Sequence, residues 1–142
     1  MLWSSACISI LGFADAVFLT AKYFSGEAPT CVLFSGCDIV TLSQYASLGG
    51  VPIALLGSLF YLSVFVLTLL YIQTQSRIVP KIMFLITGIG FLFTLYLVYL
   101  QAFVIDAFCV YCIFSATTST LLFMFSCLLK RFASLKENGE MA

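Results

Sequence analysis

Six cysteines are the residues of this chain best suited to chemistry, and four of them fall into two closely spaced pairs. Cys31 and Cys37 stand six residues apart, and Cys109 and Cys112 form a CxxC motif. In thiol–disulfide exchange a thiolate attacks a sulfur of another pair, so two pairs at one surface can pass electrons between them. The spacing therefore favours a relay, provided that the chain brings both pairs to the same place.

Two other interpretations of the pairs stay open, namely structural disulfides and a metal site. Metal sites commonly include histidine and the chain has none, so we expect no metal. The CxxC favours exchange because a thiol in the first turn of a helix, here with Asp106 as the expected cap, has a lowered pKa. Cys7 and Cys127 lie within apolar runs and are expected to pack as small hydrophobic residues.

Four apolar runs must position these cysteines. Hydrophobic residues make up 63% of the 142 positions and charged residues only 8%, against about 25% charged in an ordinary soluble domain. About 20 apolar residues in a helix cross a bilayer core of roughly 30 Å. The sequence predicts an all-α integral membrane protein in one domain, 1–142, with a bundle of four transmembrane helices over about 2–24, 51–72, 82–104 and 108–129. The first run lacks the basic start of a signal peptide and is expected to be retained.

The basic residues indicate how the chain lies across the membrane. Six basic and six acidic residues give zero net charge, so the total points to no nucleic-acid partner. Arg77 and Lys81 fall between the second and third spans, and more basic residues follow the fourth in the tail 130–142. By the positive-inside rule this side, with both termini, is expected to be cytoplasmic, and both cysteine pairs are expected to lie outside. Lys22 is the exception.

The outer segment 25–50 is long for a connection within a bundle, and such loops are usually functional or disordered. Asp38 is expected to cap a short helix over 38–46 on the outer face. Gly49 and Gly50 are expected to end that helix before the second span begins.

A relay that ends in a membrane needs an electron acceptor that dissolves there, which predicts a quinone. Aromatic side chains could hold its flat ring, although a chain with 16% aromatic residues offers such neighbours everywhere. The candidates beside Cys112 are Phe108, Tyr111 and Phe114, with Phe103 and, from the second span, Phe60 and Tyr61. Asp15 is an acid near the middle of a span, and is expected either to relay protons or to be protonated or hydrogen-bonded between helices.

The order of these motifs resembles the vitamin K epoxide reductase family in its bacterial branch. The resembling stretches are LGFADAVFLTAKYFSG, then the Cys31–Cys37 pair running into GCDIVTLSQYASLGGVPIALLG, and then FCVYCIFS, which together cover nearly the whole chain. A loop pair followed by a serine six residues on, with a CxxC opening the last helix, is a specific combination. The resemblance implies four helices around a quinone, covered by a short outer helix.

The resemblance also implies a role for each matching residue. Cys31 would exchange with a reduced thioredoxin-fold partner, Cys37 would attack Cys109, and Cys112 would lie beside the quinone. Ser43, at the place of the family's loop serine, would help to hold the short helix and the redox site. Many bacterial relatives carry a fused thioredoxin-like domain and this chain does not, so a separate, DsbA-like periplasmic partner and a location in the bacterial inner membrane are expected.

Two departures from the vertebrate pattern bear on the substrate. Ala116 and Ile53 stand where vertebrate members carry a tyrosine and an asparagine that are thought to bind vitamin K. Their absence favours reduction of a simple quinone, ubiquinone or menaquinone, over reduction of an epoxide. The alternatives are a quinone-epoxide or vitamin K reductase that uses the same thiols, and a non-enzymatic membrane protein whose disulfides are structural.

Overall fold

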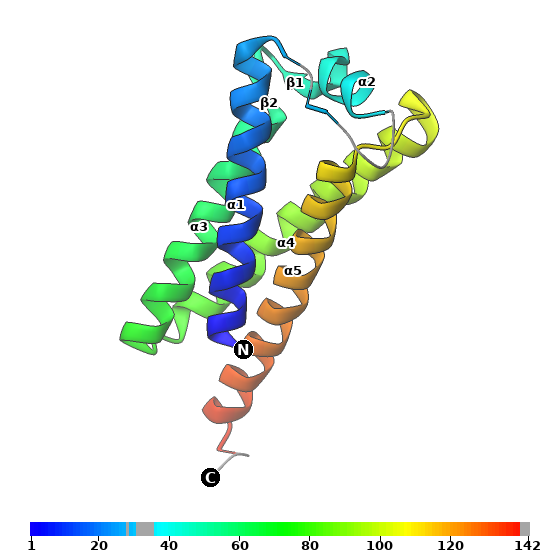
Figure 1. Cartoon of the computed structure of the whole chain (residues 1–142). Coiled ribbons are helices and arrows are strands. Elements are labelled where there is room, and N and C mark those ends of the chain that lie inside the picture. The colour runs from blue at the N-terminus through cyan, green and yellow to red at the C-terminus, as the bar shows by residue number, and fades with distance from the viewer. Residues whose placement is uncertain (28, 31–35, 140–142) are drawn as a thin grey trace.

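Four long helices make up most of the protein (Figure 1). The structure is a computed structural model and describes residues 1–27, 29–30 and 36–139. The long helices are α1 (Leu2–Ser25), α3 (Ile53–Thr74), α4 (Ile78–Tyr99) and α5 (Val110–Glu137), and α4 continues into the π-helix η2 (Leu100–Ile105). Each of the four, with η2 counted as part of α4, is long and apolar enough to cross a membrane. The expected all-α bundle of four transmembrane helices is therefore confirmed.

The ends of the helices differ from the expected ones for identifiable reasons. Helix α3 begins at Ile53 because Pro52 before it is extended. Helix α4 begins at Ile78, earlier than expected, because Pro80 in its first turn lacks an N–H that would have no helical partner there. Helix α5 continues past residue 129 to Glu137, through residues that mostly favour helix.

A small cap covers one end of the bundle. It consists of helix α2 (Cys37–Leu42), the 3-10 turn η1 (Gln44–Ala46) and a hairpin of β1 (Ser47–Leu48) and β2 (Val51–Pro52). Gly49 and Gly50 form the two-residue turn of this hairpin, and their φ angles of +59° and +87° are ones that glycine adopts without strain.

The cap corrects two expectations from the sequence. The helix expected over 38–46 is shorter, because Ser43 at its end is extended and the chain then tightens into η1. Asp38 does not cap it: Gly36 is the N-cap, and Asp38 lies in the first turn, where its charge favours the helix dipole without a capping hydrogen bond.

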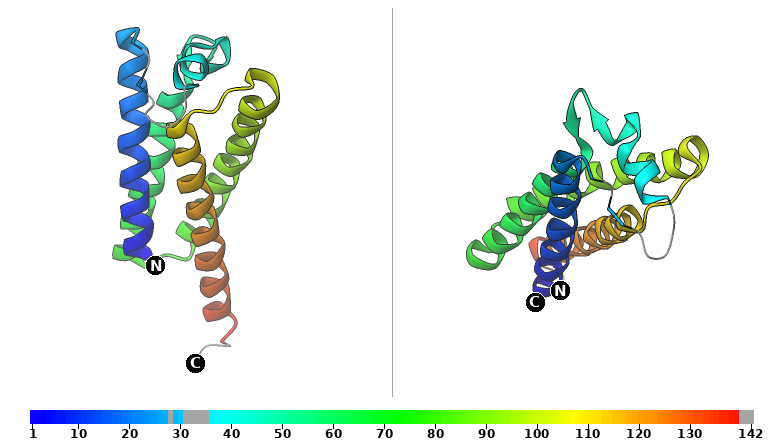
Figure 2. Two further views of the ribbon diagram at one scale, coloured as in Figure 1. Left: turned by 45° about the vertical axis from the view of Figure 1, so that its right-hand side comes forward. Right: turned by 45° about the horizontal axis from the view of Figure 1, so that its top comes forward.

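The beginning of α1 and the end of α5 lie at the end of the bundle opposite the cap (Figure 1 and Figure 2). Helix α1 packs along α3, and α4 packs along α5. The cap and the turn that leads from η2 into α5 lie at the same end. Cys37 and the CxxC motif are thereby gathered at one end of the molecule.

Tyr61 joins three of the helices in the interior of the bundle. Its ring is 1% exposed and packs directly over Gly12 of α1, where a Cβ would come within 2.3 Å of the ring. Its hydroxyl group lies 2.8 Å from the carbonyl oxygen of Ser115 and 2.8 Å from the hydroxyl oxygen of Thr118, both on α5. Hydrogen bonds between small polar side chains are a common means of holding helices together in lipid.

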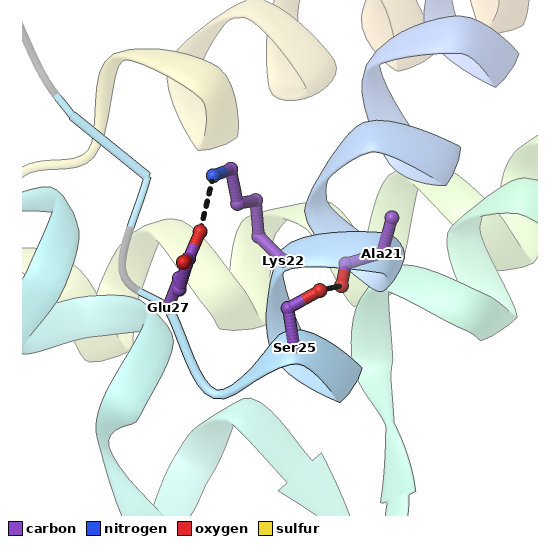
Figure 3. A network of polar contacts seen from close by, with 4 residues as sticks. All are labelled: Ala21, Lys22, Ser25 and Glu27. Carbon is purple, nitrogen blue, oxygen red and sulfur yellow. Dashed lines mark hydrogen bonds and ion pairs between the residues drawn. The ribbon is translucent and has the colours of Figure 1, made fainter.

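Lys22, the single basic residue near the cap end of α1, forms an ion pair at the surface. The ammonium group of Lys22 donates to Oε2 of Glu27 at 3.0 Å, and Ser25 donates to the carbonyl oxygen of Ala21 at 2.9 Å (Figure 3). The pair cancels the charge of Lys22 at the helix end. Lys22 nevertheless remains an exception to the distribution of the other basic residues, because the positive-inside rule counts Lys and Arg and gives Asp and Glu little weight.

Candidate redox site

The CxxC motif opens helix α5. Cys109 is the N-cap residue and is 0% exposed, and Cys112 lies in the first turn, half-buried beside it. Both are free thiols, and the Cys112 thiol donates a hydrogen bond to the Cys109 sulfur. The two sulfurs are thus neighbours, as formation of a disulfide between them requires.

Asp106 does not cap this helix, contrary to expectation. It adopts a left-handed conformation, with φ of 55°, and ends η2. The chain turns from η2 to α5 through the three residues after Asp106. Cys109, the last of them, is therefore the N-cap residue of α5.

The pKa of the Cys109 thiol is lowered from its ordinary value to about 7. The largest cause is the hydrogen bond from Cys112, which stabilises the thiolate. The amides of Tyr111 and Cys112 act in the same direction; they face the sulfur at the positive end of α5 but do not close a capping hydrogen bond of ordinary geometry. Burial and the charge of Asp15 act in the opposite direction and are outweighed.

Cys37 lies against Cys109. The two cysteines and Val40 form one buried cluster, in which Cys37 is 1% exposed, and Tyr111 and Cys112 pack around it. Cys37 is disulfide-bonded. Cys31 lies outside the described residues.

The close approach of two backbone segments brings Cys37 to this place. Gly36 lies directly against Ala107 and Phe108, so that a Cβ on Gly36 would come within 2.7 Å of the Phe108 carbonyl oxygen. Each segment immediately precedes one of the two cysteines. A residue without a side chain is needed here for the cysteines to meet.

A large apolar cavity extends from the CxxC into the bundle. Its volume is about 590 Å³, within the range of sites for small organic molecules. Residues of α3, α4 and α5 line it below the cap, and Cys112 is among them. Leu59 of α3 and Ile89 of α4 also line it, although they are 54% and 61% exposed on the outside of the bundle. The cavity therefore reaches the face of the protein that lipid would cover.

The structure separates the aromatic residues that were expected around the quinone. Tyr61 lines the cavity together with Phe60, and their rings are 5.1 Å apart. Phe108, Tyr111 and Phe114 do not line it: Phe108 and Phe114 are 44% and 43% exposed, and Tyr111 packs on the cysteine cluster and on Phe18. Successive residues along a helix point to different sides of it, so nearness in sequence to the CxxC did not place these rings in the cavity.

Three further predicted positions line the cavity. The Ser43 hydroxyl group donates to the carbonyl oxygen of Val40 at 2.8 Å at the end of α2, and its role in holding the redox site stays a prediction. Ile53 and Ala116, the two departures from the vertebrate pattern, both contribute to the wall. That part of the wall is therefore apolar.

Gln101 was not singled out from the sequence, although the structure places it at the centre of the site. It belongs to η2, is 4% exposed and lines the cavity. Its Oε1 accepts a hydrogen bond from the N–H of Cys109 at 3.3 Å. The signal that could have found it is an amide residue standing alone at the end of a long apolar run, shortly before the CxxC.

The remaining candidates lie away from the cavity. Asp15 does not line it, but its Oδ2 is enclosed and is the one such side-chain oxygen or nitrogen without a hydrogen-bond partner among the described residues. Its role in proton transfer stays a prediction. Cys7 is exposed on the outside of α1, and Cys127 is half-buried in α5. In the part of the chain that the structure describes, no three metal-binding side chains gather.

The fold and the site together define a class of protein. Four helices capable of crossing a membrane hold a CxxC at one end, in contact with a further cysteine, and the CxxC borders an apolar cavity. These are the features of a multi-pass membrane protein that carries out thiol redox chemistry.

Comparison with known families identifies the group to which the chain belongs. The profile of the Vitamin K epoxide reductase family matches residues 3–127, and the chain is a member of that family. No match to an individual curated protein was found. The chain is accordingly a membrane oxidoreductase of a family that uses quinone-type substrates and generally works with thioredoxin-like partners.

Proposed function

We propose that this protein is a thiol:quinone oxidoreductase, which takes electrons from a reduced thioredoxin-fold protein and passes them through its two cysteine pairs to a membrane quinone. The observation that carries the proposal is the position of the CxxC between two features. Cys37 packs against Cys109 on one side, and on the other side Cys112 borders the apolar cavity. Electrons that enter through Cys37 thus have a covalent route to the cavity.

Each exchange step breaks one disulfide and forms another. The partner dithiol reduces the Cys31–Cys37 disulfide and leaves as a disulfide. The Cys37 thiolate then attacks Cys109 in a Cys109–Cys112 disulfide, and Cys112 departs as a thiolate. Attack by Cys31 on the mixed disulfide restores Cys31–Cys37 and leaves Cys109 and Cys112 reduced. Two electrons and two protons have then moved inward for each disulfide made in the partner.

The cavity suits the second half of the reaction. A quinone supplies a two-electron acceptor, and reoxidation of Cys109 and Cys112 to a disulfide releases the two electrons and two protons that convert it to a quinol. The wall beside Cys112 is mostly apolar, and Phe60 and Tyr61 offer aromatic surface to a flat ring. The lipid-facing part of the wall supports entry from the bilayer.

We also infer the orientation and the location of the protein in the cell. The basic residues after α5 and between α3 and α4 support a cytoplasmic location for that end of the bundle. The cysteine pairs then face the periplasm of a bacterium, in its inner membrane. The partner would be a separate DsbA-like protein, to which this enzyme supplies disulfides.

Replacement of Cys112 tests the proposal. We expect Cys112→Ser to abolish reduction of decylubiquinone by the purified protein with dithiothreitol as the reductant, because Cys109 would have no internal partner. In the same variant without dithiothreitol, the Cys109 thiolate should attack Cys37 of the oxidised outer pair, with Cys31 leaving as a thiolate, and the resulting Cys37–Cys109 mixed disulfide should be found by mass spectrometry of unreduced peptides. Cys127→Ser, on the same helix but away from the cavity, is the matched control and should retain the wild-type rate. A Cys112→Ser protein with the wild-type rate would exclude the relay.

The same preparation separates the two alternative functions. The apolar side chains of Ile53 and Ala116 in the cavity wall favour a simple quinone over an epoxide, and we expect quinone to be reduced much faster than its epoxide when the two are assayed side by side. Structural disulfides would stay oxidised when reduced partner is added, whereas relay cysteines become accessible to a thiol-trapping reagent.

A further inference from the structure

Gln101 makes one side-chain hydrogen bond, and this bond fixes the orientation of its amide group. The N–H of Cys109 is a donor, so the atom that faces it, 3.3 Å away, must be the amide oxygen of Gln101. The amide nitrogen of the same group is therefore directed away from the CxxC backbone. The orientation of this amide follows from chemistry and is the same whatever occupies the cavity.

The amide nitrogen is left without a protein partner. Neither of its two N–H donors bonds to any residue that the structure describes. The amide nitrogen of Gln101 is also not fully buried. Among the described residues, Oδ2 of Asp15 is the only fully buried side-chain oxygen or nitrogen that lacks a hydrogen-bond partner. Since Gln101 is 4% exposed and lines the cavity, the cavity is the place where such a donor can find an acceptor.

Three other polar side chains in the wall have no free proton to donate. The hydroxyl groups of Thr41, Ser43 and Ser63 donate to carbonyl oxygens in or at the end of their own helices. Their single protons are thus already used. An amide has two protons to donate, and neither is used in Gln101.

We propose that Gln101 is a substrate-binding residue of the quinone site: its Oε1 holds the start of the CxxC helix while its amide nitrogen donates a hydrogen bond to a carbonyl oxygen of the quinone. The inference rests on the proposed function and adds the group that orients the ring. One side chain ties the ring to the backbone of Cys109, and so sets the distance between the ring and Cys112. The hydrogen bond strengthens as the quinone oxygen gains negative charge during reduction.

The test compares a quinone with a hydrocarbon of similar shape. Decylubiquinone and undecylbenzene, which has a ring and tail but no oxygen, are each titrated into the purified full-length protein in detergent. The rise in unfolding temperature gives the apparent Kd. Gln101→Met keeps the length of the side chain and removes the donor. We expect it to raise the apparent Kd for decylubiquinone about 10-fold, as loss of one hydrogen bond predicts, and to leave that for undecylbenzene unchanged.

Two further variants complete the experiment. Gln101→Glu keeps an oxygen for the N–H of Cys109 and, as a carboxylate, replaces the donor by an acceptor, so it should also weaken quinone binding if the methionine variant fails to fold. Val104→Ala, at an exposed position of the same π-helix, is the matched control and should bind both ligands as the wild type does.

Three results would overturn the inference. Wild-type affinity for decylubiquinone in the folded variants would show that the amide makes no bond to it. Equal weakening for both ligands would show that Gln101 only shapes the cavity. If the wild-type protein itself showed no saturable effect of decylubiquinone, the proposed function would fail together with the inference, and this outcome is distinct from the other two.

Discussion

Cys109 and Cys112 have different surroundings although they share one turn of helix. Cys109 is enclosed, receives the hydrogen bond of its neighbour and lies against the cysteine of the cap. Cys112 borders the cavity. In the proposed function the residue that exchanges with the outer pair and the residue that faces the acceptor are therefore distinct, and the chemistry at each can be changed separately.

The lowered pKa of Cys109 predicts how the inner pair responds to pH. Below a pKa of about 7 the Cys109 thiol is protonated, and closure of the Cys109–Cys112 disulfide requires its thiolate. The rate at which decylubiquinone oxidises pre-reduced protein in a single turnover should therefore fall as pH falls and level off above this pKa. The slope below the pKa should approach about tenfold per pH unit. Single turnover keeps the reductant's own titration out of the profile.

The control variant for this pH profile removes the hydrogen bond that contributes most to the lowered pKa of Cys109. In Cys112→Ala the hydrogen bond to the Cys109 sulfur is lost, and the thiolate absorbance in the ultraviolet should titrate at a higher pH than in the wild type. A wild-type rate that keeps rising well above the pKa of Cys109 would contradict this assignment.

At the scale of the elements, the contact between the cap and the start of α5 decides whether the two pairs can meet. It depends on the absence of a side chain at Gly36, which lies against the backbone of Phe108. The contact joins segments far apart in the sequence. It therefore could not be predicted from either segment alone.

Replacement of this glycine should separate the pairs. We expect Gly36→Ala to push the cap away from Phe108 and to slow electron transfer from the outer pair to Cys109 at least tenfold, with the redox chemistry of the CxxC itself retained. Quenched-flow trapping of the Cys37–Cys109 intermediate measures this rate. Gly88→Ala in α4 is the control, because its Cβ would meet nothing closer than 3.5 Å. An unchanged rate in Gly36→Ala would mean that the close approach is not required.

The elements were predictable to the extent that they are local. Each apolar run predicts its own helix because every backbone group in lipid must be bonded within the segment. The hairpin around Gly49 and Gly50 is also local, and it was missed because these glycines were interpreted as helix breakers. The π-helix that holds Gln101 was missed because its apolar sequence resembles the rest of the third run. The cysteine pairs were visible from spacing. Most residues that line the cavity could not be predicted, because the face that a ring of Phe108 or Phe114 presents is set by how the helices pack.

At the scale of the whole molecule, close packing of α1 on α3 keeps the bundle together beside the cavity. Two glycines lie on this interface with different amounts of room. A Cβ on Gly12 would overlap the ring of Tyr61, whereas a Cβ on Gly57 would lie 3.7 Å from the Cβ of Ala16. The first position is filled by a neighbour and the second has space.

These two positions form a matched pair for a stability measurement. Gly12→Ala should destabilise the protein by about 1 to 3 kcal/mol, as overpacking does. Gly57→Ala should be neutral or stabilise it by up to about 1 kcal/mol, because alanine favours helix. Unfolding in a mixed-detergent titration checks both. Equal effects of the two substitutions would show that Tyr61 moves aside readily.

The orientation of the bundle can be tested with a reporter. We expect alkaline phosphatase, which is active only outside the cytoplasm, to be active when inserted between Gly49 and Gly50 and inactive when fused after Asn138 or inserted in the turn between α3 and α4. This pattern follows from the basic residues near that turn and at the end of α5. The reverse pattern would place the cysteines in the cytoplasm.

The part of the cavity wall formed by Leu59 and Ile89 has a consequence for kinetics. A substrate that enters through this wall arrives from the hydrocarbon phase, so its effective concentration is its mole fraction among lipid or detergent molecules. Extra detergent at constant total quinone will then slow turnover by surface dilution, while a change in buffer volume will not. Acyl chains of the surrounding amphiphile will compete for the same entrance, so KM will depend on their length.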